Sequence, residues 1–119
     1  MSQRDPAGNQ RRAERKRAST AAIVTDIISG QAMGQLGNLS SSGMLLIGPR
    51  APRSEALYQV SVALPATRQA SAIPPPTIEV GIQEQWHEPA ASGQVWAGYR
   101  IVAIDGHDAV QLEHWLATP

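Results

Sequence analysis

The sequence lacks cysteine, phenylalanine and any long apolar run. Without cysteine, disulfides and thiolate metal sites are excluded, which fits a reducing cytoplasm. No apolar run approaches the roughly 18 residues that a membrane helix requires. The polar start Met1-Ser2-Gln3-Arg4-Asp5 is not followed by the apolar segment of a signal peptide. We therefore expect a cytoplasmic protein with no direct membrane insertion.

Aromatic side chains are few, because phenylalanine is absent. The sequence alone places the aromatic part of the core in five residues: Trp86, Trp96, Trp115, Tyr58 and Tyr99. Apolar residues make up 42% of the chain and charged residues 17%, which is ordinary for a soluble globular protein. A chain of 119 residues has room for one domain with a modest core.

The formal net charge of zero conceals an uneven distribution. Residues 1–17 carry six basic and two acidic groups, giving +4, and the remainder carries four basic and eight acidic groups, giving −4. A basic arm on an acidic body is typical of an anion-binding segment, although charge alone describes a solvated terminus equally well. We expect residues 1–10 to be disordered and residues 11–17 to form an exposed basic arm.

The chain after the arm has the pattern of a mainly β protein. Apolar and β-branched runs separated by glycine, proline and serine predict strands over 20–29, 31–37, 44–47, 58–64, 78–86 and 95–104. In the fifth strand, alternation places Ile78, Val80, Ile82 and Trp86 inward, with Glu84 as the exception. We expect a barrel over 18–105 that is plugged or capped by a helix over 107–117, with Asp108 as its N-cap.

Arginines four residues apart, Arg11 and Arg15, form the first candidate binding element. A guanidinium is a fixed fork of donors that meets phosphate, or the O6/N7 edge of guanine, in a bidentate manner. The basic run offers a second register from Arg12 to Lys16, and Arg17 is close enough to contribute.

The second candidate element is the polar turn Asn38-Leu39-Ser40-Ser41-Ser42-Gly43, which precedes an apolar strand. Asn38 and Ser40 are two apart, so on a strand they face the same side, where both can bond a phosphate, ribose or base edge. Gly43 permits backbone geometry that other residues avoid, and it lets a ligand approach. The alternative is a turn stabilised by its own side chains, with no ligand.

An R-x-x-x-R element followed by an N-x-S-x-x-G element and an apolar strand resembles the PilZ domain family. The late strand Gly98-Tyr99-Arg100-Ile101 and the closing helix extend the resemblance over essentially the whole chain. The resemblance implies a six-stranded antiparallel β-barrel with a C-terminal α-helix that binds the bacterial second messenger cyclic di-GMP. It implies that the ligand is contacted by two sets of residues. On the arm these are Arg11, Arg12, Arg15 and Arg17, and on the turn they are Asn38, Ser40 and Gly43.

The function that this resemblance implies is a cyclic di-GMP receptor. It would signal to a partner protein by reorienting the arm and the helix, in the control of motility or biofilm formation. Whether one dinucleotide or a stacked pair binds stays open. The alternative is a PilZ-like protein-interaction adaptor that does not bind cyclic di-GMP. A third possibility, a barrel that binds RNA or single-stranded DNA, is disfavoured because no aromatic residue is interleaved with the basic arm.

No residue pattern in the sequence predicts an enzyme or a metal site. His87, His107 and His114 lack metal-ligand spacing, and they are expected at the surface or as caps. The serine run contains no G-x-S-x-G element, and paired carboxylates at catalytic spacing are missing. We therefore expect no catalytic residues and no metal ligands.

Overall fold

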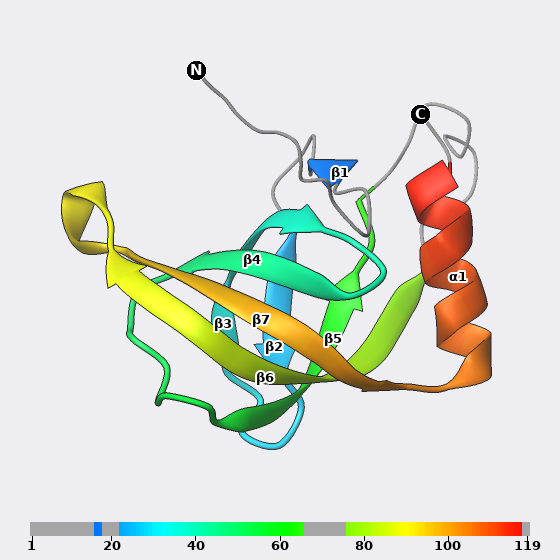
Figure 1. Cartoon of the computed structure of the whole chain (residues 1–119), viewed down its shortest axis with the longest axis horizontal. Helices are drawn as coiled ribbons and strands as arrows, with labels where there is room; N and C mark the ends of the chain where they lie inside the picture. Colours follow the sequence, from blue (N-terminus) through cyan, green and yellow to red (C-terminus); the bar gives the residue numbers. More distant parts are fainter. Residues whose placement is uncertain (1–15, 18–21, 66–75, 118–119) are drawn as a thin grey trace.

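The computed structural model describes residues 16–17, 22–65 and 76–117 (Figure 1). The predicted tail 1–10 and arm residues 11–15 lie outside the described residues. The elements in chain order are β1 (Lys16–Arg17), β2 (Ile23–Asp26), β3 (Ala32–Leu39), β4 (Gly43–Gly48), β5 (Leu57–Ala63), β6 (Thr77–Pro89), a 3-10 turn (Ala91–Gly93), β7 (Val95–Ile104) and α1 (Gly106–Ala117).

Six strands close into an antiparallel barrel. Their order is β3-β2-β5-β6-β7-β4, and β4 pairs with β3 again to complete the ring. In Figure 1, β4, β7 and β6 cross the front of the barrel and β2, β3 and β5 form its back. The predicted six-stranded antiparallel β-barrel with a C-terminal helix is confirmed. The two-residue strand β1, predicted as part of an exposed arm, pairs with the end of β3 instead.

The barrel interior is filled by alternate residues of facing strands. Val60 and Val62 of β5, and Ile78, Val80 and Ile82 of β6, are fully buried, as the alternation predicts. The second predicted strand extends two residues further than expected, to Leu39, because β4 and β1 both pair with its end.

A β-bulge between Glu84 and Trp86 reverses the facing of β6. A bulge puts two residues opposite one on the partner strand, so the side chains that follow change faces. Glu84 continues the inward alternation of Val80 and Ile82 and is inside, with 2% of its surface exposed. The bulge after it turns Trp86 to the outside, with 45% exposed. The prediction for this strand is wrong at Trp86, which was expected to face inward. The predicted core position of Trp96 is also wrong, because 42% of its surface is exposed.

Two glycines let β3 and β4 approach each other closely at the barrel wall. A Cβ built on Gly34 meets the Ile47 carbonyl carbon at 2.9 Å, and one built on Gly48 collides with the Met33 carbonyl oxygen. Backbone atoms cannot move aside as a flexible side chain can. Gly34 of β3 and Gly48 of β4 are therefore required by the close approach of the two strands.

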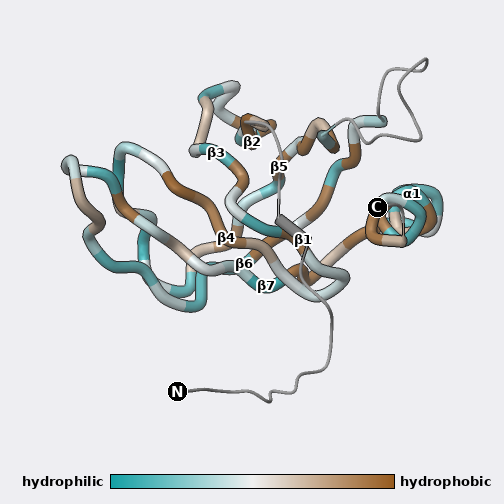
Figure 2. The backbone as a smooth tube through the Cα atoms, turned by 90° about the horizontal axis from the view of Figure 1, so that it is seen from above, coloured by the Kyte–Doolittle hydropathy of each residue, from teal (hydrophilic) through white to brown (hydrophobic). Residues whose placement is uncertain are grey.

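Helix α1 begins earlier than predicted, and its N-cap is Asp105. The Asp105 carboxylate accepts a hydrogen bond from the Asp108 N–H at 2.9 Å. Asp108, the predicted cap, instead accepts from the Glu79 N–H of β6 at 3.1 Å, which ties the helix to the barrel. Leu112 and Trp115 are buried, and the Trp115 indole donates to the Pro65 carbonyl at 2.9 Å. Figure 2 shows α1 against one side of the barrel.

Within the described part of the chain, no helix combines the length and the apolar character needed to cross a membrane.

Candidate functional site

The turn between β3 and β4 is built around the side chain of Ser40. Its hydroxyl accepts hydrogen bonds from the Gly43 N–H at 3.1 Å and the Ser42 N–H at 3.2 Å, and it lies 3.3 Å from the Gly43 carbonyl. The Ser40 N–H donates to the same carbonyl at 2.9 Å. Ser40 has 0% of its surface exposed, so its hydroxyl shapes the turn from within.

The two other residues of this motif lie in ordinary strand geometry. Gly43 does not have a positive φ, so the backbone freedom that glycine permits is not used at this position. It is buried and pairs with Arg100 of β7. Asn38 is half-buried on β3 and pairs with Leu45 of β4.

A single row of paired residues crosses five strands and connects the last residue of the basic arm, Arg17, with the second sequence motif. In order, Arg17 pairs with Asn38, Asn38 with Leu45, Leu45 with Gly98, and Gly98 with Trp86. Directly paired residues of antiparallel strands lie on the same face of the sheet. The row therefore runs across the outer face of β3, β4, β7 and β6, and the end of the basic arm adjoins it through the backbone of Arg17.

Of the predicted arginines, only Arg17 falls in a described strand. Arg11, Arg12 and Arg15 lie outside the described residues. The arm was expected to lie next to the turn. Its last residue, Arg17, pairs through its backbone with Asn38 at the start of that turn.

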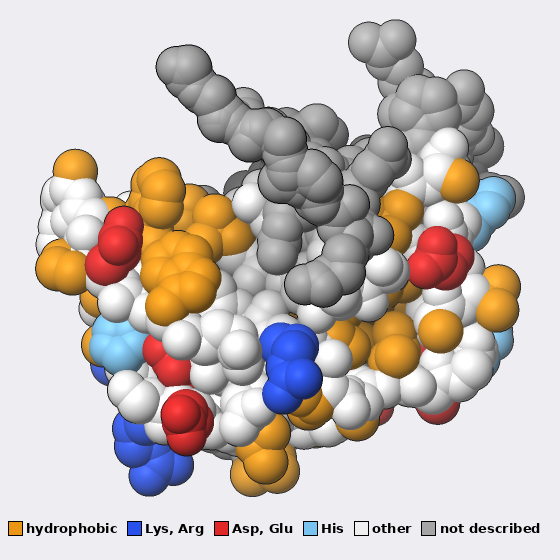
Figure 3. Space-filling model, in the orientation of Figure 1, with side chains coloured by type: hydrophobic (Ala, Val, Ile, Leu, Met, Phe, Trp, Pro, Cys, Tyr) orange, Lys and Arg blue, Asp and Glu red, His pale blue; other side chains and the backbone are white. Residues whose placement is uncertain are grey.

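Two exposed indoles lie on the β6–β7 part of this outer face. Trp86 lies directly on Gly98, since a Cβ built on that glycine would collide with the indole ring. Trp96 pairs with Glu88, one row further along the same face. Figure 3 looks onto this face and shows hydrophobic side chains gathered over the part where β6 and β7 extend furthest. A base could stack on such a surface, because every base has a π-face.

Sequence reasoning missed these two tryptophans as surface residues, although one signal was available. The turn after Pro89 sets the register of the β6–β7 hairpin, and this register places Trp86 opposite Gly98 and Trp96 opposite Glu88. The turn was visible in the sequence, but the bulge that reverses the facing of β6 was not.

Opposite Gly43, the same face carries a positive charge. Arg100 pairs with both Gly43 and Gln83, it is exposed, and its guanidinium donates to the Gln83 side chain at 3.2 Å. Among the residues whose side chains the structure describes, this outer face thus combines the exposed cation Arg100, the exposed carboxylate of Glu88 beside Trp96, and the two indoles.

The buried carboxylate of Glu84 serves a structural purpose on the inner side of the same strands. One oxygen accepts from the Glu55 N–H at 2.8 Å, and the other lies 2.7 Å from Nδ1 of His87. These two hydrogen bonds, the backbone one foremost, lower the pKa of Glu84 below its usual value of 4.5. The hydrogen bond from the Glu55 N–H to Glu84 holds the loop 49–56 against the barrel. Among the described residues there is no group of three or more potential metal ligands.

Solved structures resemble this barrel, although no family model and no curated protein matches the sequence. The Bacillus subtilis inhibitor of motility MotI/DgrA aligns with a TM-score of 0.70 and 14% identity, over 90% of this chain and 49% of that one. The Escherichia coli protein YcgR in complex with c-di-GMP aligns with a TM-score of 0.67 and 15% identity, over 90% of this chain and 44% of that one.

The YcgR PilZ domain with c-di-GMP, also from Escherichia coli, aligns with a TM-score of 0.59 and 15% identity. This alignment covers 88% of the chain and 87% of the domain, so the likeness extends over most of both. The chain has a PilZ-like fold. The predicted fold resemblance is confirmed. The PilZ-like barrel spans less than half of the length of MotI or YcgR.

Proposed function

We propose that this protein is a cyclic di-GMP receptor. The dinucleotide binds on the outer face of β3, β4, β7 and β6, between the arginine arm and the Asn38–Gly43 turn. The protein then signals to a partner protein through a change in the position of the arm and the helix. Two of the similar structures carry c-di-GMP, by their own description, on the same fold.

The observation that carries the proposal is the row from Arg17 through Asn38 to Gly98 and Trp86. It brings the end of the basic arm to the second motif, which lies more than twenty positions later in the sequence. Arg15 is two positions before Arg17, so covalent geometry keeps its Cα within about 8 Å of the Arg17 Cα. An arginine there is within reach of a ligand that lies on the turn.

The chemistry of the outer face suits a dinucleotide with two phosphates and two purine bases. Arginines of the arm would bind phosphate or the guanine edge bidentately. The exposed Trp86 and Trp96 offer flat surfaces on which a base can stack. Ser40 acts in this scheme by shaping the turn, since its hydroxyl is already hydrogen-bonded within it.

Calorimetric titration of cyclic di-GMP into the wild type and four variants tests the proposal. A bidentate contact contributes about 1–3 kcal/mol, so Arg11→Ala and Arg15→Ala are each expected to weaken binding by roughly 10- to 100-fold. Asn38→Ala is expected to weaken binding as well. Arg53→Gln removes a positive charge from the loop 49–56, away from the outer face, and serves as the matched control with unchanged affinity.

Three results would overturn the proposal in distinguishable ways. No heat with the wild type would favour the adaptor that does not bind cyclic di-GMP. Binding that Arg11→Ala and Arg15→Ala leave unchanged would place the ligand elsewhere. An equal loss in Arg53→Gln would indicate that only overall charge matters. The same titration gives the number of dinucleotides bound per chain.

A further inference from the structure

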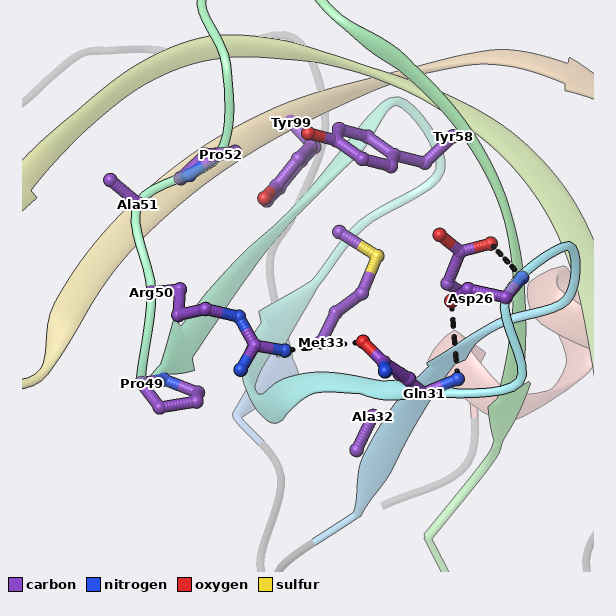
Figure 4. A pocket seen from close by; sticks show the side chains of 11 residues that line it. Asp26, Gln31, Ala32, Met33, Pro49, Arg50, Ala51, Pro52, Tyr58 and Tyr99 are labelled. Carbon is purple, nitrogen blue, oxygen red and sulfur yellow. Dashed lines mark hydrogen bonds between the residues drawn. The ribbon is translucent and has the colours of Figure 1, made fainter.

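A pocket of about 140 Å³ lies at the end of the barrel away from the Ser40 turn (Figure 4). Strands β3 and β4 meet at that turn, and their other ends line the pocket through residues 31–33 and 49–50. The remaining walls come from the end of β2 and the β2–β3 connection, from the loop 49–56, and from Tyr58 of β5 and Tyr99 of β7. The pocket is therefore separate from the outer face that we propose for cyclic di-GMP.

The hydroxyl of Tyr99 points into this pocket from β7 (Figure 4). Only 5% of the Tyr99 surface is exposed, and its hydroxyl makes no hydrogen bond to any residue that the structure describes. Buried polar groups normally have a partner, so a hydroxyl in this state is suited to a bound molecule. Burial, together with the neighbouring Tyr58 and Glu84, raises the pKa of Tyr99, which keeps the hydroxyl a donor at neutral pH.

Two opposite charges face each other across the pocket. Arg50 donates one hydrogen bond, to the neutral Gln31 side chain at 3.4 Å, and pairs with no carboxylate in the described part of the chain. On the other side, one oxygen of Asp26 accepts from the Ile28 and Ser29 N–H groups at 2.9 and 3.3 Å. Its second oxygen has no hydrogen bond within the described ranges. Figure 4 shows Met33 between the two charged groups.

The walls of the pocket are held in place before any ligand binds. Tyr58 packs edge-on against Tyr99, with ring centres 6.1 Å apart, and its hydroxyl accepts from the Arg53 N–H at 3.3 Å. Glu84 fixes the same loop through the Glu55 N–H. A preformed site loses little freedom on binding, which favours even a small ligand.

We propose that this pocket binds a small zwitterion, an α-amino acid. Its carboxylate would bind Arg50 and the Tyr99 hydroxyl, and its ammonium would bind the second oxygen of Asp26. A plain carboxylate would be repelled by Asp26 and a plain cation by Arg50, whereas a zwitterion satisfies both. The volume is close to that of an engineered cavity of about 150 Å³ that holds benzene, so a ligand of about six heavy atoms fits.

An NMR titration of the full chain with three test ligands examines the proposal. L-Alanine carries both charges, acetate only the carboxylate and methylammonium only the ammonium. We expect L-alanine to shift the backbone amide signals of residues 26–33, 50 and 51, and each half-ligand to bind roughly tenfold or more weakly, because each lacks one charge-assisted contact.

Three substitutions locate the contacts. Arg50→Gln, Asp26→Asn and Tyr99→Phe are each expected to weaken L-alanine binding, the two charge changes by roughly tenfold. The asparagine retains an oxygen for the turn, and phenylalanine retains the ring packing, so a dispersed spectrum verifies the fold of each variant. Arg53→Gln is the control with unchanged binding. Cyclic di-GMP affinity should not change in any of these variants.

The proposal is overturned if L-alanine causes no shifts at residues 26–33 in the folded wild type. It is equally overturned if acetate binds as well as L-alanine, or if Arg50→Gln and Asp26→Asn bind L-alanine as the wild type does. These outcomes are independent of cyclic di-GMP binding, so this proposal and the proposed function can fail separately.

Discussion

Replacing Ser40 with alanine tests whether this motif serine shapes the turn or contacts the ligand. The substitution removes the acceptor for two backbone N–H groups, those of Ser42 and Gly43. Ser42 is exposed, so its N–H can turn to water, but Gly43 is buried and its N–H would lose its partner. An unsatisfied buried donor costs about 1–3 kcal/mol, so we expect a loss of about 2 kcal/mol in the free energy of unfolding.

That loss is large against the roughly 5–15 kcal/mol by which such domains are stable. At about 4 °C per kcal/mol for a domain of this size, Tm should fall by about 8 °C. Urea unfolding followed by circular dichroism gives the free energy directly, and Ser41→Ala is the matched control. Ser41 is exposed and makes no hydrogen bond within the described chain, so its loss should cost no more than about 0.5 kcal/mol.

Two outcomes would refute this reasoning. If Ser40→Ala unfolds at the same urea concentration as Ser41→Ala, the hydroxyl does not hold the turn. If stability is unchanged while cyclic di-GMP binding is lost, the hydroxyl contacts the ligand, and its hydrogen bonds within the turn are replaceable.

Three further predictions concern other parts of the barrel. Gly98→Ala should displace the Trp86 indole and cost about 1–3 kcal/mol, with a red shift of tryptophan fluorescence that Trp86→Phe abolishes. Because hydrogen bonds, chiefly from the Glu55 N–H, lower the pKa of Glu84, its stabilising contribution is complete above the usual value of 4.5 and is lost as the pH falls below it. Glu84→Gln should therefore flatten stability against pH in that acid range, measured by urea midpoints. Trp115→Ala should cost about 3–5 kcal/mol in the same assay, since the indole is buried between α1 and the barrel.

Each of these predictions has an opposite result that would contradict it. An unshifted fluorescence spectrum in Gly98→Ala would mean that the indole does not lie on the glycine. An unchanged acid slope in Glu84→Gln would assign the acid sensitivity to other carboxylates. A wild-type urea midpoint in Trp115→Ala would mean that α1 contributes little to the stability of the barrel.

Much of the fold was predictable, because strand alternation and turn residues act locally. The strand over Val95–Ile104 has the bounds that the sequence indicates, and the alternation of Val60 with Val62 identified core residues correctly. The predicted helix cap failed because two aspartates three positions apart compete for the role. Asp108 is used instead to bond the Glu79 N–H of β6, a contact that no local pattern reveals.

The site was predictable in part. The N-x-S-x-x-G pattern identified the β3–β4 turn, and the β1–β3 pairing brings Arg17, the last residue of the basic arm, to Asn38. The contacts of the motif residues with a ligand stay a prediction. The tryptophans were misplaced because the facing of β6 after Glu84 depends on one extra residue in its pairing with β7. The pocket with Tyr99 was invisible for a related reason, since its walls come from strands that are distant in sequence.

By itself, the sequence determined which segments become strands, which residues are basic, and where the chain turns. These properties depend on residues that are close together along the chain. Side chains alternate between the two faces of a strand, and glycine, proline and serine favour the backbone conformations of turns. Only the tertiary structure decided that Ser40 is buried within its own turn and that Trp86 covers Gly98 on the outside. Those outcomes depend on register and barrel closure, which join residues that are far apart along the chain.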